Sequence, residues 1–221
     1  MVQITYSQNF IAHVKQLYFL SLEQMVSGKV IRYGINCYSH YAGPAYVSAV
    51  ASIEALINEI TFGSEAKVIL KESSLWSLEK NWLEKMDLMA KLIIVPQLLF
   101  NQTFQRDRQP YQDMVTLTKV RNYFVHYKMD LNIKGFKDLE DRGLALPKDP
   151  SGVDHPWTIK LSSSEGIRWA NNTVCKVASA FFEFIPEDKK PFLFGDMATN
   201  FQEISENVVL KKLELAGIRY D

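Results

Sequence analysis

Residues 45–62 form an apolar helical segment whose hydrophobic positions occupy nearly the whole circumference of the helix. Pro44 precedes the segment and Gly63 follows it, which matches the preference for proline at the start and glycine just past the end of a helix. At about 100° per residue, its apolar side chains spread around the axis: Val47, Val50, Ile53, Leu56, Ile57, Ile60 and Phe62. Other elements must cover such a helix, so the sequence predicts a helical bundle around it.

Helical spacing recurs along most of the remaining chain. Apolar residues repeat at three- and four-residue steps in several further segments, the second of which should end at Pro96: 8–27, 74–95, 110–128, 162–185 and 197–215. Residues 130–161 instead collect glycine and proline, which predicts an inserted loop or short hairpin ending in a strand at 157–161. We therefore expect an all-α bundle of about five to six helices. It should form one domain over 1–221, with a core at about 8–185 and a helical extension at 190–221.

The composition narrows the class of protein. The chain has 221 residues, is 47% hydrophobic, and carries 25 Lys and Arg against 25 Asp and Glu, so it suits neither a disordered chain nor a protein that coats nucleic acid non-specifically. Two distant cysteines and the lack of a signal-peptide pattern favour a reducing compartment. The longest apolar run, 92–100, is too short to cross a bilayer. We expect a soluble cytoplasmic protein without a membrane partner.

Common cofactor and metal motifs are missing from the sequence. Cys37 and His40 have the spacing of half a zinc site, but no second pair completes the four ligands that a structural zinc ion needs. The glycine-rich phosphate loop, the dinucleotide fingerprint and the serine-hydrolase elbow do not occur. The sequence therefore predicts no metal and no cofactor.

Polar residues interrupt two of the apolar patterns. Glu54 and Asn58 lie four residues apart inside the apolar arc of 45–62. On the helix of 110–128, Arg121 points from a sector that also contains Met114 and Val125. A guanidinium in such a place needs acceptors, because it cannot lose its proton. We therefore expect Glu54 and Asn58 to be the partners of Arg121.

Asn122 and His126 form a second polar pair beside Arg121. They are separated by four residues and lie at roughly 100° and 140° from Arg121 on an ideal helix. All three side chains can then face one ligand at a seam between helices. This helix is the candidate site.

The segment Arg121 to His126 resembles the R-x(4–6)-H signature of HEPN domains, in the form where a polar residue follows the arginine. The segment 52–60 resembles the second helix of many members, and the order of the helices also fits. Some members carry a tyrosine two residues after the histidine, whereas this chain has Lys128 there and Tyr127 one position earlier. The resemblance implies a helical bundle that cleaves RNA without metal as a homodimer. Its site would contain Arg121, Asn122 and His126, supported by Glu54, Asn58 and Tyr127.

The chemistry of these residue types agrees with that activity. Cleavage by the 2′-hydroxyl of RNA needs a base, an acid and positive charge near the phosphate. One histidine per chain provides half of the acid–base pair, and a second copy across a two-fold axis would provide the other half. Such an enzyme could serve as a toxin, controlled by an antitoxin or regulatory protein, or as an antiviral effector.

Two other interpretations remain open at this stage. The same residues could hold helices together in a non-catalytic RNA-binding or protein-interaction module, with Arg121 paired to Glu54. The zero net charge favours that interpretation. A bundle that binds a nucleotide or another small molecule is the third.

Overall fold

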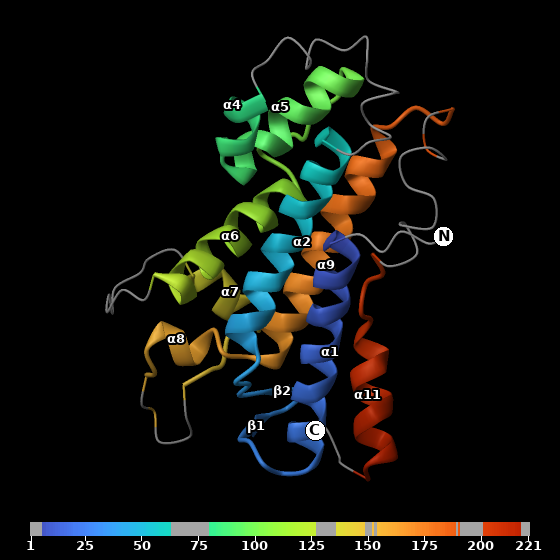
Figure 1. Cartoon of the computed structure of the whole chain (residues 1–221). Coiled ribbons are helices and arrows are strands. Elements are labelled where there is room, and N and C mark those ends of the chain that lie inside the picture. The colour runs from blue at the N-terminus through green and yellow to red at the C-terminus, as the bar shows by residue number, and fades with distance from the viewer. Residues whose placement is uncertain are drawn as a thin grey trace.

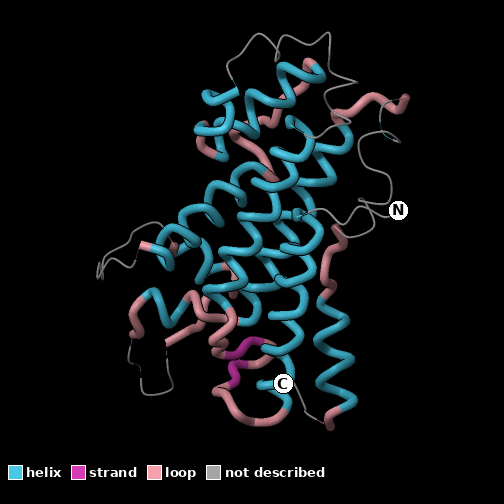
Figure 2. The backbone as a smooth tube through the Cα atoms, viewed as in Figure 1, coloured by secondary structure: helices cyan, strands magenta, loops and turns pink. Residues whose placement is uncertain are grey.

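The computed structural model of the chain is predominantly helical (Figures 1 and 2), as expected for the all-α class. It describes residues 6–62, 80–126, 136–148, 152, 154–188, 190 and 201–217. Six helices within these ranges have ten or more residues: α1 (Tyr6–Val26), α2 (Ala42–Phe62), α5 (Leu88–Phe100), α6 (Tyr111–Val125), α9 (Ser164–Glu183) and α11 (Glu206–Leu215). The shorter elements are helices α4 (Lys80–Lys85), α7 (Lys137–Asp141) and α8 (Trp157–Lys160) and strands β1 (Arg32–Tyr33) and β2 (Asn36–Cys37).

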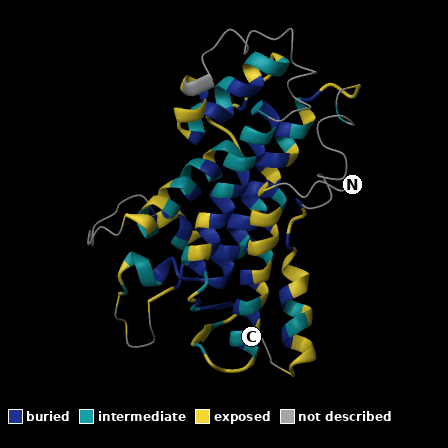
Figure 3. Ribbon diagram, in the orientation of Figure 1, coloured by how far each residue is buried: buried dark blue, intermediate teal, exposed yellow. Residues whose placement is uncertain are grey.

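Helix α2 lies at the centre of the bundle, as its apolar circumference predicts. It packs against α1, α9, α6 and α5 (Figure 1). Its core-facing side chains are fully or almost fully buried (Figure 3): Tyr46, Val50, Ile53, Leu56, Ile57 and Ile60. The helix is long and apolar enough to cross a membrane, a test that a buried core helix also passes, and most of its apolar window is buried in the bundle.

The burial of α2 is less complete than its sequence indicates. Val47 is 41% exposed, and Ala51, Glu54 and Ala55 are only partly buried. Ala51 follows Val47 by four residues, and Glu54 and Ala55 follow Ala51 by three and four, so these positions form one strip along the helix. The expectation that Glu54 lies inside the core is therefore wrong, since it belongs to this partly open strip.

The ends of two helices follow the expected local chemistry. Gly28 has a φ of +69° just after α1, the left-handed conformation that glycine adopts at helix ends. Helix α9 begins one residue later than its capping pattern indicates: Ser163, not Ser162, is the cap, and its Oγ accepts a hydrogen bond from the Gly166 N–H at 2.9 Å.

The segment 74–95 is not one helix. Residues 74–79 lie outside the described ranges, and the rest is divided between α4 and α5. The Asp87 side chain accepts hydrogen bonds from the backbone N–H groups of Met89 and Ala90, so it caps a new helix. Pro96 does not end that helix but lies buried within it, and α5 continues to Phe100.

The region 130–161 contains helices where a hairpin was expected. Among its described residues, 136–148 includes α7, and the predicted strand at 157–161 is occupied by α8. The Ile159 and Lys160 N–H groups donate to the Pro156 carbonyl, so this backbone satisfies itself locally and needs no partner strand. The β1–β2 hairpin occurs elsewhere, between α1 and α2.

The last helix is shorter than predicted. Helix α11 begins at Glu206, residues 201–205 are irregular, and 191–200 lie outside the described ranges. Val209 and Leu213, four residues apart, are fully buried, and α11 packs against α1 (Figure 1). The extension thus adds its apolar face to the core.

Candidate functional site

Helix α6 is anchored to the bundle by a continuous apolar seam. Met114, Leu117 and Val120 are fully buried, and α6 packs against α2 and α9. At the end of the helix, the ring of Phe124 packs on Tyr46 of α2, with ring centroids 5.4 Å apart. This packing holds the last turn of α6 against the first turns of α2.

Of the three motif residues, Asn122 and His126 lie on the side of α6 away from this seam, and Arg121 lies at its border. Arg121 is half-buried, whereas Asn122 and His126 are exposed. The backbone N–H of His126 donates a hydrogen bond to the backbone carbonyl of Asn122 at 2.9 Å, which closes the last turn of the helix. Val125 lies between Arg121 and Asn122 in angle, at roughly 40° from Arg121, and is 50% exposed. Together these four residues form a solvent-accessible surface at the C-terminal end of α6, which we call the motif strip.

Arg121 lies near the edge of the apolar seam, where the exposure of the side chains begins to rise. The buried residue Val120 lies at roughly 260° when Arg121 is set at 0°, which moves the centre of the seam away from the arginine. Val125, on the other side of Arg121, is half exposed, so it does not extend the seam. A guanidinium at this border can reach water, and the expected need for buried acceptors does not arise.

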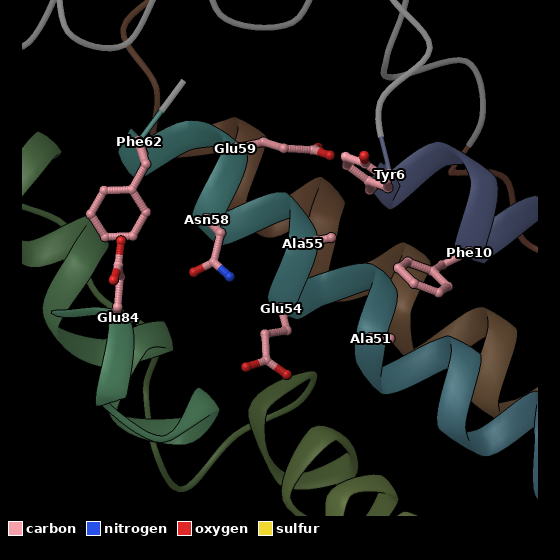
Figure 4. A pocket seen from close by; sticks show the side chains of 9 residues that line it. All are labelled: Tyr6, Phe10, Ala51, Glu54, Ala55, Asn58, Glu59, Phe62 and Glu84. Atoms are coloured by element: carbon pink, nitrogen blue, oxygen red, sulfur yellow. The ribbon is translucent and has the colours of Figure 1, made fainter. Parts of the chain in front are cut away.

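Glu54 and Asn58 do not meet Arg121. Both line a cavity of about 670 Å³ between α1, α2 and α4, whose wall also includes Phe10 and Glu84 (Figure 4). The Asn58 Oδ1 accepts a hydrogen bond from Lys91 Nζ at 3.0 Å. Within the described ranges, no hydrogen bond or ion pair joins Arg121 to either residue, so the predicted pairing is wrong.

The packing register of α2 and α6 explains this separation. Phe124 lies opposite Gly43 and Tyr46, and the two helices run in opposite directions. Arg121, one turn before Phe124, therefore lies opposite the segment just after Tyr46. Glu54 is eight residues beyond Tyr46 and about five beyond the level of Arg121, which places it roughly 7–8 Å farther along the helix axis than Arg121. Periodicity within each helix contains no information about this register.

Lys119 is a cation that the sequence analysis did not include. It is exposed and precedes Asn122 by three residues and His126 by seven, so all three share one side of α6. The spacing in the sequence was sufficient to find it. Tyr127, the remaining supporting candidate, lies outside the described residues.

The motif strip can bind a polyanion and exchange protons. Arg121 and Lys119 supply positive charge, Asn122 offers a carboxamide donor, and the exposed His126 imidazole can donate or accept a proton. Comparison of the chain with protein-family models, with curated proteins and with solved structures finds no match. The chemistry and exposure of these side chains are therefore the basis for inferring a function.

Proposed function

We propose that this protein is a metal-independent endoribonuclease of the HEPN type that acts as a homodimer through the motif strip. One observation carries the proposal: Arg121, Asn122 and His126 share a solvent-accessible surface at one end of α6. A buried imidazole could not reach an RNA phosphate, whereas this one can.

Each group has a role in the proposed reaction. A base removes the proton of the 2′-hydroxyl, the 2′-oxygen attacks the phosphorus, and an acid protonates the 5′-oxygen as its bond to phosphorus breaks. The products are a 2′,3′-cyclic phosphate and a 5′-hydroxyl. His126 of one copy would serve as base and His126 of the other as acid. Arg121 would stabilise the charge on the phosphate, and Asn122 would orient it.

The central experiment measures cleavage of a labelled RNA by the purified chain in the presence of EDTA. His126→Ala should lower the rate by about 100-fold or more, because it removes the acid–base group. His13→Ala is the matched control, since that histidine lies on α1 and bonds Ser48 at 3.0 Å. Full cleavage by pure His126→Ala protein would rule out the proposed site.

Arg121→Ala separates a catalytic role from a structural one. Arg121 is half-buried and, in the part of the chain that the structure describes, forms no hydrogen bond or ion pair. We therefore expect the free energy of unfolding to change by less than about 0.5 kcal/mol while cleavage falls sharply. A large loss of stability with unchanged cleavage would favour a purely structural arginine.

The proposed dimer is tested at Val125, the exposed apolar residue of the motif strip. Val125→Glu should abolish both the dimer, measured by light scattering, and RNA cleavage, because it places a charge in the proposed interface. Leu215→Glu is the control, since Leu215 is 80% exposed on α11. A wild-type protein that stays monomeric at every concentration would contradict the shared site.

A non-catalytic RNA-binding or protein-interaction module is the second candidate. The balanced charge of the chain and the exposed Val125 favour it. RNA binding or partner binding without cleavage at any protein concentration would establish this alternative. Within the ribonuclease proposal, a role as a cytoplasmic toxin or antiviral effector, with an antitoxin or regulatory partner, predicts that expression arrests cell growth only when His126 is intact.

A further inference from the structure

The cavity between α1, α2 and α4 is a surface groove with an apolar floor. It has a volume of about 670 Å³, and none of the motif-strip residues lines it. Its apolar side chains come from α1 and α2 (Figure 4): Tyr6, Phe10, Ala51, Ala55 and Phe62. The two aromatic residues of α1 are well exposed, Tyr6 at 75% and Phe10 at 36%. Apolar surface that is gathered in one place and bordered by polar groups is typical of an interaction site.

Helical geometry places a carboxylate on each side of the alanine floor. With Glu54 at 0° on α2, Ala51 and Ala55 lie at roughly 60° and 100° around the helix axis. Glu59 lies at roughly 140°, on the other side of the two alanines. Figure 4 shows Glu54 and Glu59 pointing to different sides of Ala55. The groove therefore has an apolar centre and an acidic border on both sides.

The negative charge of this border is not neutralised by its surroundings. Glu54 forms no hydrogen bond or ion pair in the described part of the chain. Glu59 accepts hydrogen bonds from the backbone N–H and the hydroxyl of Ser7, at 3.1 and 2.6 Å, and both donors are uncharged. Glu84 adds a third carboxylate, and no described lysine or arginine lines the groove. The buried ammonium of Lys91, which donates to the Glu84 carbonyl, balances only one of the three charges.

A helix fits this groove better than an extended chain does. The strip from Val47, which is 41% exposed, to Phe62 is about 22 Å long, or roughly four helical turns. Alanines four residues apart leave space in which the side chains of a second helix can pack. A helix also satisfies its own backbone hydrogen bonds, whereas a strand needs the edge of a sheet. None of the described lining residues belongs to the β1–β2 hairpin.

We propose that this groove binds an amphipathic helix of a partner protein that has an aliphatic face bordered by lysine or arginine residues. The aliphatic side chains pack on Phe10, Ala51 and Ala55. The basic side chains pair with Glu54 on one side and Glu59 on the other, which fixes the position of the helix and disfavours acidic partners. The inference does not depend on RNA cleavage, because the groove and the motif strip share no residue.

The test is titration of a labelled synthetic peptide with the full chain, followed by fluorescence anisotropy. The peptide consists of two repeats of Lys-Leu-Ala-Lys-Leu-Ala-Lys, so it has an aliphatic face bordered by lysines and about the length of the strip. It should bind in a saturable manner. Two control peptides should bind about tenfold more weakly or not at all. One has glutamate in place of every lysine, and the other has the same composition in an order that spreads the leucines around the helix.

Variants of the groove locate the binding. Ala51→Arg places a long cationic side chain on the floor and should weaken binding of the lysine peptide by about tenfold or more. Glu54→Lys reverses one border charge and should weaken binding by about fivefold. Glu214→Lys is the matched control, because this exposed carboxylate lies on α11, which does not line the groove.

Three outcomes would overturn the proposal: no binding of the lysine peptide at millimolar concentration, equal binding of the reordered peptide, or unchanged binding by Ala51→Arg. Self-association of the free chain that Ala51→Arg abolishes would also contradict it, since a second copy would then occupy the groove. If circular dichroism shows that Ala51→Arg does not fold, Glu54→Lys decides, because the side chain of Glu54 has no described partner to lose. Weaker binding by Glu54→Lys than by Glu214→Lys supports the site, and equal binding contradicts it.

Discussion

Gly43 in the first turn of α2 lies directly against the ring of Phe124 in the last turn of α6. A Cβ atom at residue 43 would stand 3.0 Å from Phe124 Cδ1, closer than almost all real contacts of this kind. The lack of a side chain at Gly43 thus lets the end of α6 approach α2. This contact sets the position of the motif strip relative to the bundle.

A valine at residue 43 should push the Phe124 ring outward. We expect Gly43→Val to lower the free energy of unfolding by about 1–3 kcal/mol, the usual cost of overpacking, as measured by urea denaturation. The smaller side chain in Phe124→Leu should relieve the overlap with the valine. The double variant Gly43→Val with Phe124→Leu should therefore lose less free energy of unfolding than the two single variants lose together. Additive losses would show that the two residues do not interact.

Gly166 should tolerate substitution even less. A Cβ atom there would overlap the Tyr46 hydroxyl oxygen and lie 2.8 Å from Ser163 Oγ and 3.1 Å from the Leu144 carbonyl oxygen. The Tyr46 hydroxyl cannot easily move, because it donates to the Leu161 carbonyl at 2.7 Å. We expect Gly166→Ala to lower the free energy of unfolding by about 3 kcal/mol, as measured by thermal or urea denaturation.

Removal of the Tyr46 hydroxyl tests the cause of that loss. Tyr46→Phe alone should cost about 1–2 kcal/mol through the lost hydrogen bond. The double variant Gly166→Ala with Tyr46→Phe should be more stable than the sum of the two single losses predicts, because the overlap between the new Cβ atom and the Tyr46 hydroxyl disappears. A combined loss equal to or larger than the sum would mean that the clash lies elsewhere.

The buried ammonium of Lys91 should depend on Asn58. Lys91 is only 2% exposed and donates to Asn58 Oδ1 at 3.0 Å and to the Glu84 carbonyl at 3.3 Å. Asn58→Leu should therefore destabilise the protein by about 2 kcal/mol, because a buried charge loses an acceptor.

The double variant Asn58→Leu with Lys91→Met should recover most of that stability, since neither polar group remains unpaired. Lys176→Met is the control for loss of a lysine, as this exposed side chain pairs with Glu203 only at 3.6 Å. Equal instability of the single and double variants would contradict a role for the unpaired ammonium.

Stability should fall at alkaline pH through the buried thiols. Burial raises the pKa of Cys175 from 9.0 to about 12. The folded state therefore keeps the thiol neutral while the unfolded chain ionises. The contribution of this thiol to the free energy of unfolding is complete below about pH 9 and is lost as the pH rises towards 12. Between pH 8 and pH 10 we expect it to lower the free energy of unfolding by about 1 kcal/mol.

Urea unfolding of the wild type and of Cys175→Ala at pH 8, 9 and 10 measures this effect. The variant should be less stable overall, but its stability should fall less steeply with pH. Burial also raises the pKa values of Cys37, Tyr18 and Tyr46, so part of the slope should remain. Identical slopes for the two proteins would show that Cys175 does not titrate in this way.

Much of the local structure could be predicted from neighbouring residues. The apolar circumference of 45–62 predicted a central helix, and Gly28 predicted the end of the first one, because both signals act within one or two helical turns. Helix boundaries were predicted wrongly where a capping residue or a proline competed with the apolar periodicity. Asp87 starts a new helix inside an apparently continuous pattern, and Pro96 is accommodated within α5.

The amino-acid sequence by itself determined that the chain forms a helical bundle and that Arg121, Asn122 and His126 share one end of a helix, because helical geometry relates residues three and four apart. Only the tertiary structure decided that this end faces solvent, that Glu54 lies farther along α2 than Arg121, and that Asn58 binds Lys91. The register between two helices depends on which side chains fit together, as Gly43 and Phe124 do, and that fit exists only once both helices have packed.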